Sequence, residues 1–300
     1  MEKEFFSEHI RINISKLAFK IIQQDLVIFS FTRKLNFNGF INRLIYLYIK
    51  NSCESYDVIP NHTKIKGDSY EFRFNNDAMN EYNDSVDYLN KKYSHERATL
   101  FFKGILESYA RLPFVKRETV ILQNLIDDIN KAINNKKQIK LKTHNIDINI
   151  TPYEIVRSKE GSFSYLIGFD LENKIHAIRI SHIRSLKLFG KAHIIPEYIL
   201  INADEMIAEY GPTFVEEPLE EIHIQFLTEK AKLSYEYSII HRPIHTNIID
   251  KDNNIYSFTC SLKQAEYFFF RFAGEVKILK PTELKNKIVN AYRKGIEANN

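Results

Sequence analysis

The fold of this chain is decided by the run Phe163-Ser164-Tyr165-Leu166-Ile167-Gly168-Phe169-Asp170 and by the short segments on either side of it. Tight turns such as Lys159-Glu160-Gly161 and Glu172-Asn173-Lys174 separate segments whose apolar residues recur with a period near two, which indicates β-strands. The expected strands are Gln138–Lys142, Ile146–Ile150, Tyr153–Ser158, Ser164–Asp170, Ile175–Ile180 and Arg184–Phe189. Many short strands with tight turns predict a small β-barrel over residues 137–212.

Residues 213–300 follow the order of an α+β domain. We expect strands at Glu221–Thr228, His245–Ile249 and Ile255–Ser261, and helices near Lys230–Tyr237, Leu262–Phe272 and Pro281–Ala298. Strands and helices in this order predict an α+β sandwich.

The N-terminal segment has a different pattern. His9, Arg11 and Asn13 alternate with three isoleucines, which predicts a short strand with one polar face. Two amphipathic helices are expected behind it, the first capped by Ser15 and the second, from Phe37 to Ile49, capped by Asn36 or Asn38. Residues 57–136 are expected to form a helical linker with a strand at Tyr70–Phe74 and helices at Met79–Tyr93, Glu96–Leu112 and Pro113–Asn135.

A lone strand leaves its backbone N–H and C=O groups unpaired, which is costly. The pattern therefore predicts a partner strand, and the simplest source of that strand is a second copy of the chain. With Asn36-Phe37-Asn38-Gly39-Phe40-Ile41-Asn42-Arg43-Leu44-Ile45 at the start of the second helix, roughly residues 8–50 resemble the ribbon-helix-helix family, and we assign residues 1–56 to a domain of this kind. The resemblance implies a homodimer held by N-terminal strand pairing. It also implies that His9, Arg11 and Asn13 read duplex DNA, while Asn38 and Gly39 hold a phosphate. Two alternatives stay open: these side chains only solvate an edge strand, or the segment is only a dimerisation clasp.

Three runs in the barrel region resemble the WYL domain, a small Sm- or SH3-like barrel of bacterial transcription regulators and phage-defence proteins: Thr151–Val156, Phe163–Asp170 and Ile178–Leu186. The run Phe272–Leu284 resembles the WCX extension that commonly follows this barrel. Together they imply a multidomain α+β protein with a ribbon-helix-helix segment, a helical bridge, a WYL barrel and a WCX domain.

The WYL resemblance implies a site for a nucleic-acid or nucleotide-like effector, made by a tyrosine and basic residues on adjacent strands. Tyr165 holds the tyrosine position, Arg179 a basic position, and His182 the second basic position, with Arg184 two residues further on. Ser164 stands where the family has tryptophan, so base stacking would fall to Phe163 or Phe169. A core role for Tyr165 and a solvated strand position for Arg179 are the structural alternatives.

Composition and motifs exclude other classes. The net charge of +4 is small, with 42 Lys and Arg against 38 Asp and Glu, so a nucleic-acid site must be a local patch. Cys53 and Cys260 have no partner at metal-ligand spacing, and Pro243 interrupts the pair His241 and His245, so no metal and no cofactor is expected. No catalytic motif is found, and we expect no enzyme, no membrane span and a cytoplasmic location.

The sequence therefore predicts a dimeric transcription regulator that binds DNA and senses an effector through its WYL barrel. The alternative is a different class of protein. Ribbon-helix-helix plus WYL architectures also resemble accessory proteins found beside RNA-targeting type VI CRISPR effectors, and this resemblance implies binding of single-stranded RNA and modulation of a nuclease effector.

Overall fold

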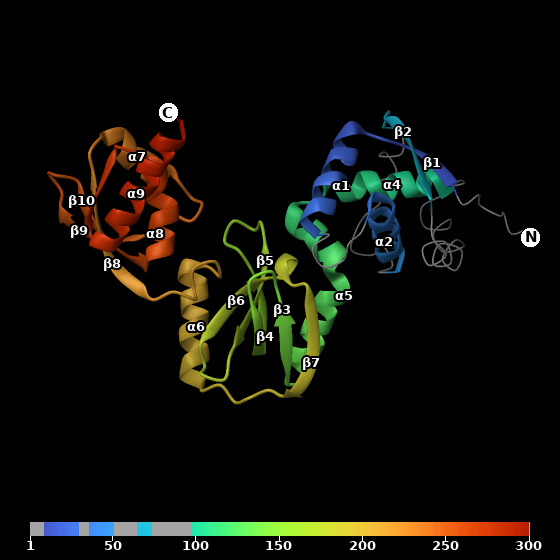
Figure 1. Cartoon of the computed structure of the whole chain (residues 1–300), viewed down its shortest axis with the longest axis horizontal. Coiled ribbons are helices and arrows are strands. Elements are labelled where there is room, and N and C mark those ends of the chain that lie inside the picture. Colours follow the sequence, from blue (N-terminus) through green and yellow to red (C-terminus); the bar gives the residue numbers. More distant parts are fainter. Residues whose placement is uncertain (1–8, 30–35, 51–64, 74–97, 300) are drawn as a thin grey trace, which may run out of the picture. The chain divides into compact units, whose positions relative to one another are not determined.

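The computed structural model describes residues 9–29, 36–50, 65–73 and 98–299 (Figure 1). Its helices and strands form an α+β architecture with three sheets. The chain divides into two compact units: the first holds residues 1–152, 162–164 and 178–192, and the second holds 153–161, 165–177 and 193–300. The expected helix Met79–Tyr93 lies outside the described residues.

The N-terminal part of the first unit is a two-stranded sheet packed on helices. Its elements are β1 (His9–Ile14), α1 (Lys16–Phe29), α2 (Phe37–Lys50), β2 (Asp68–Arg73) and α4 (Ala98–Arg111). Ile12 and Ile14 are buried while Arg11 and Asn13 are exposed, which confirms the predicted alternation.

The expectation that β1 needs a second chain as its partner is wrong in its premise. β1 pairs antiparallel with β2 of the same chain, in continuous register from His9 opposite Arg73 to Ile14 opposite Asp68. The backbone groups of β1 therefore pair with a segment of the same chain that lies 54 to 64 residues further on. β2 and α4 come from the range expected to be a linker, and both contact β1.

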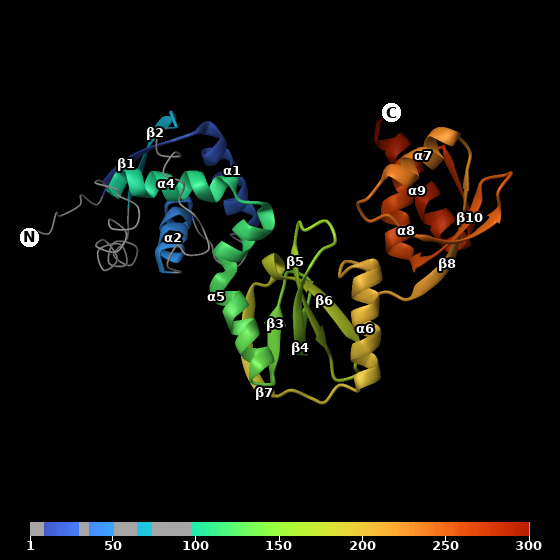
Figure 2. The ribbon, with the colours of Figure 1, turned by 180° about the vertical axis from the view of Figure 1, so that it is seen from behind.

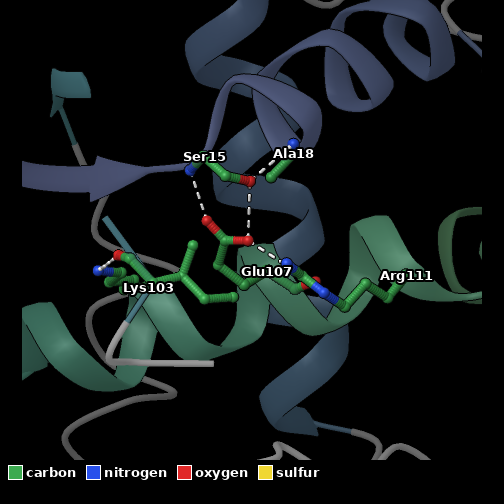
Figure 3. Close-up of polar contacts among 6 residues, drawn as sticks. Ser15, Ala18, Lys103, Glu107 and Arg111 are labelled. Carbon is green, nitrogen blue, oxygen red and sulfur yellow. Dashed lines mark hydrogen bonds and ion pairs between the residues drawn. The ribbon is translucent and has the colours of Figure 1, made fainter. Parts of the chain in front are cut away.

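Ser15 caps α1, as the sequence predicts, but the cap is completed from another helix (Figure 3). The Ser15 hydroxyl accepts a hydrogen bond from the Ala18 amide at 3.1 Å and donates to Oε2 of Glu107 at 3.0 Å. The Ser15 amide donates to Oε1 of Glu107 at 2.5 Å, and Arg111 donates to Oε2 at 2.6 Å. In a capping box the acid lies three residues after the cap. Here that position is Ala18, and α4 supplies the carboxylate.

A second buried acid joins α1 and α4 to α5 (Phe114–Asn134). Asp25 of α1 accepts hydrogen bonds from the Tyr109 hydroxyl at 2.7 Å and from Nε of Arg117 at 2.6 Å. Burial, and then the charge of Asp25, holds the pKa of Tyr109 well above its usual range. These contacts orient α5, which leads directly into the next sheet.

That sheet has five strands in the order β6-β5-β4-β3-β7. Its strands are β3 (Lys137–Lys142), β4 (Asp147–Arg157), β5 (Ser164–Phe169), β6 (Ile175–Arg179) and β7 (Ser185–Lys191), with the 3₁₀ turn η3 (Ile180–His182) between β6 and β7. The two strands expected at residues 146–150 and 153–158 are one strand, because Thr151 and Pro152 are buried inside β4 rather than forming a turn.

The second unit contains a helix that the sequence reasoning missed, α6 (Glu197–Tyr210). Its signals were local. Pro196 is the N-cap residue, and Gly211 ends the helix at a φ of 80°, a conformation that glycine adopts without strain.

The C-terminal sheet follows the expected α+β order with one added strand. Its elements are β8 (Leu219–Phe226), α7 (Glu229–Tyr237), β9 (His245–Asp250), β10 (Ile255–Ser261), α8 (Leu262–Phe269), the turn η4 (Phe270–Phe272), β11 (Val276–Lys280) and α9 (Thr282–Asn299). The strand order is β11-β8-β10-β9, and β11 was not predicted. The helices cover one side of the sheet (Figure 2), and Phe258, Phe268 and Phe269 form the centre of the core between them.

Candidate nucleic-acid interface

An arginine lies over an aromatic ring in the first unit. Arg179 ends β6, and its guanidinium carbon is 3.4 Å from the centroid of the Phe163 ring. Phe163 meets Phe114 of α5 edge to face, with ring centroids 5.5 Å apart. Cation–π stacking restricts the guanidinium to one plane while its N–H edges remain donors. Of the two rings expected to replace the missing tryptophan, Phe163 is half-buried and Phe169 is fully buried.

A buried carboxyl from α5 lies beside this pair. Oε2 of Glu118 accepts a hydrogen bond from the Ser164 amide at 2.9 Å, and Glu118 is fully buried. Burial raises the pKa of Glu118, while hydrogen bonding from Ser164 and the positive charge of Arg179 oppose the shift. Glu118 thus holds the residue next to Phe163 and places a negative charge near Arg179. Sequence reasoning missed Glu118, because only the fold brings α5 close to Ser164 at the start of β5.

Next in the chain, His182 and Arg184 line a cavity of about 330 Å³. Thr143, His144 and Asn145, from the turn between β3 and β4, form the rest of its lining. Burial, and then the charge of Arg179, lowers the pKa of His182 below 6.5. Arg184 therefore supplies the permanent charge of this cavity at neutral pH, and His182 adds charge only in acid. The structure brings together two predicted residues here and adds His144, which the sequence reasoning missed.

Tyr165 belongs to the second unit. Its ring is half-buried, and its hydroxyl accepts a hydrogen bond from the Thr213 hydroxyl at 3.4 Å. Its role at an effector site stays a prediction.

The polar face of the sheet formed by β1 and β2 carries opposite charges. Nε of Arg11 lies 3.6 Å from Oε2 of Glu71, its cross-strand partner, and Asn13 lies opposite Ser69. The Arg11 side chain is 79% exposed, so it remains accessible. His9 begins the strand, and its side chain is outside the described part of the structure. DNA reading by this face stays a prediction, and Glu71 adds a negative charge to it.

The side chain of Asn36, the residue before α2, already caps the start of this helix. The Gly39 amide, expected to hold a phosphate, donates to the side-chain oxygen of Asn36 at 2.8 Å. The Asn38 carbonyl accepts a hydrogen bond from the Asn42 side chain at 2.8 Å. Asn36, rather than Asn38, is therefore the cap of this helix.

A metal site and a membrane-spanning helix each set requirements with which the described residues can be compared. Among the described residues, no three His, Cys, Asp or Glu side chains gather in a way that could hold a metal ion. His241 lies in a turn at a φ of 54°, and His245 begins β9. No helix in the described ranges is both long enough and apolar enough to cross a membrane.

Comparison with known proteins gives a likeness of fold. Neither a family model nor a curated protein matches the sequence. A solved structure titled "Crystal structure of a CRISPR Cas-related protein" aligns with a TM-score of 0.80 and 20% identity, over 99% of this chain and 96% of that chain. The proteasome accessory factor B/C (PafBC) of Arthrobacter aurescens aligns over 73% of this chain and 35% of that chain, with 15% identity and a TM-score of 0.29, too low to support equivalence.

Proposed function

We propose that this protein is a non-enzymatic, WYL-type accessory protein that binds single-stranded RNA and modulates an RNA-targeting CRISPR nuclease. The observation that carries the proposal is the stack of Arg179 on Phe163. It lies in the same part of the chain as the cavity lined by His182 and Arg184.

The chemistry of this region suits a single strand better than a duplex. Unstacked bases of single strands pack on aromatic rings and guanidinium planes, while permanently charged arginines bind the phosphates. The guanidinium of Arg179, held over the Phe163 ring, supplies a plane for a base, and Arg184 supplies a charge at the cavity. A duplex keeps its bases stacked inside and would use only the charges.

The nuclease partner is proposed from the likeness of fold. Nearly the whole chain aligns with the CRISPR Cas-related protein, so the likeness includes the N-terminal module as well as both later sheets. The protein in that structure is described as CRISPR Cas-related, and on this ground we propose a CRISPR nuclease as the partner of this chain.

A second candidate is the dimeric transcription regulator. The exposed polar face of the ribbon favours it, because a two-stranded ribbon fits the DNA major groove and Arg11 and Asn13 point outward. In this proposal the edge of β1 that does not pair with β2 pairs with β1 of a second copy. Asn38 and Gly39 then lie close to a DNA phosphate. Tyr165 belongs to the effector site.

Fluorescence anisotropy with a labelled single-stranded RNA and with duplex DNA, each titrated at several salt concentrations, tests the two candidates. We expect tighter binding of the single strand, and weaker binding by Arg184→Gln than by the control Arg293→Gln, an exposed arginine of α9. Preference for the duplex, lost in Arg11→Gln and kept in Arg184→Gln, would overturn the accessory proposal in favour of the regulator.

A further inference from the structure

Lysines face lysines across the pairing of β3 and β7. Lys140 lies directly opposite Lys187, and Lys137 lies opposite Lys191. All four side chains are exposed. On β3 the alternate residues Ile139 and Leu141 are fully buried, so Lys140 and Lys142 share the outer face of the strand. Lys137 and Lys191 lie beyond a register shift at the far end of this pairing. We call Lys140, Lys142 and Lys187 together the lysine face.

This arrangement costs stability. Like charges directly opposite each other on neighbouring strands destabilise a sheet. Among the described residues, one ion pair to the lysine face is found, between Lys140 and Asp147 of β4 at 3.5 Å, and both of its side chains are about half exposed. An exposed pair of this kind offsets little of the repulsion. An anion lying across both strands would offset the repulsion between Lys140 and Lys187.

The lysine face runs between two cavities. At the end where β3 finishes and β7 begins lies the cavity of Arg184, whose backbone amide donates to the Lys142 carbonyl at 2.7 Å. At the other end a cavity of about 490 Å³ is lined by Lys131, Asn135, Lys137, Leu188, Phe189 and Gly190. Phe189 is 40% exposed there, an accessible ring beside lysines.

We propose that the lysine face is a track for the sugar-phosphate backbone of single-stranded nucleic acid, leading from the Arg184 cavity to a base-stacking position on Phe189. The proposal rests on the proposed function and extends it to residues outside the Arg179 stack. Alternate residues of a strand are about 6.6 Å apart, comparable with the distance between successive phosphates of an extended strand. Charges on the track and a ring at its end are the combination that binds single strands without sequence preference.

Lys187→Gln tests the track, because this change removes a phosphate contact and also removes the repulsion of Lys140. We expect weaker binding of single-stranded RNA and a slope of log K against log salt that is smaller by about 0.7, the value for one phosphate contact on a single strand. The melting temperature should stay equal or rise. Lys277→Gln is the matched control, since Lys277 is an exposed lysine within β11 with Gln225 opposite it.

Phe189→Leu tests the end of the track separately. We expect it to weaken binding of a long oligonucleotide, while a short one, held at the Arg184 cavity alone, binds as before. Unchanged affinity and salt slope in Lys187→Gln, together with weaker binding in Arg184→Gln, would overturn the track and leave the proposed function standing. If both variants bind RNA like the wild type, the proposed function falls as well.

Discussion

The carboxylate of Glu107 binds both the amide and the hydroxyl of Ser15, at 2.5 Å and 3.0 Å, although the two residues are 92 positions apart. One side chain of α4 therefore accepts hydrogen bonds from both donors of Ser15, the residue that joins β1 to α1 (Figure 3). The strand with the exposed Arg11 is oriented by this contact, so the stability of the N-terminal module and the direction of its polar face depend on the same carboxylate.

Glu107→Gln is expected to lower the free energy of unfolding by about 2–3 kcal/mol, because a buried, charge-assisted hydrogen bond is lost and an amide N–H is directed at donors. Urea denaturation measures the change. Glu229→Gln, at an exposed position in the first turn of α7, is the control and should change stability little. Equal midpoints for the two variants would show that Glu107 is not needed for this cap.

Glu118→Gln is expected to change how stability depends on pH. The folded-state pKa of Glu118 is raised above 4.5, so the folded protein binds more protons than the unfolded one as the pH rises from 4.5, and its stability falls over that window. Glutamine cannot ionise. The stability of the variant relative to wild type should therefore increase with pH across the window, as thermal melts at several pH values would show. A difference that is constant with pH would contradict the raised pKa.

Arg179→Lys is expected to weaken binding of single-stranded RNA about tenfold, because lysine keeps the charge but loses the planar stack on Phe163. Anisotropy titration measures the affinity, and Arg184→Lys is the matched control that changes the same chemistry at the cavity. If Arg179→Lys binds as tightly as the wild type, charge alone explains binding and the stack has no part in it.

His182 should make RNA binding depend on pH. Its pKa is lowered below 6.5, so it gains a positive charge only in mild acid, and affinity should rise as the pH falls through that lowered value. His182→Gln should remove this rise, whereas Arg184→Gln should bind more weakly and retain it. His144→Gln shows whether the second histidine of the cavity contributes. The same rise in His182→Gln as in wild type would remove His182 from the site.

The local pattern of residues was enough for several elements. The alternation around Ile12 and Ile14 predicts β1, and the cap at Ser15 predicts where α1 begins, because each depends on neighbours a few positions away. Local signals also existed for α6 between Pro196 and Gly211, and these were overlooked.

The pairing of distant segments was decided by tertiary structure. The partner of β1, the continuity of β4 through Pro152, the ring beneath Arg179 and the lysine opposite Lys140 each join residues whose spacing in the sequence carries no signal. Periodicity tells which side of a strand is apolar, but register and strand order follow from how the whole set of apolar faces is buried together. The sequence by itself determined which side chains were available to bind nucleic acid, and packing determined which of them meet.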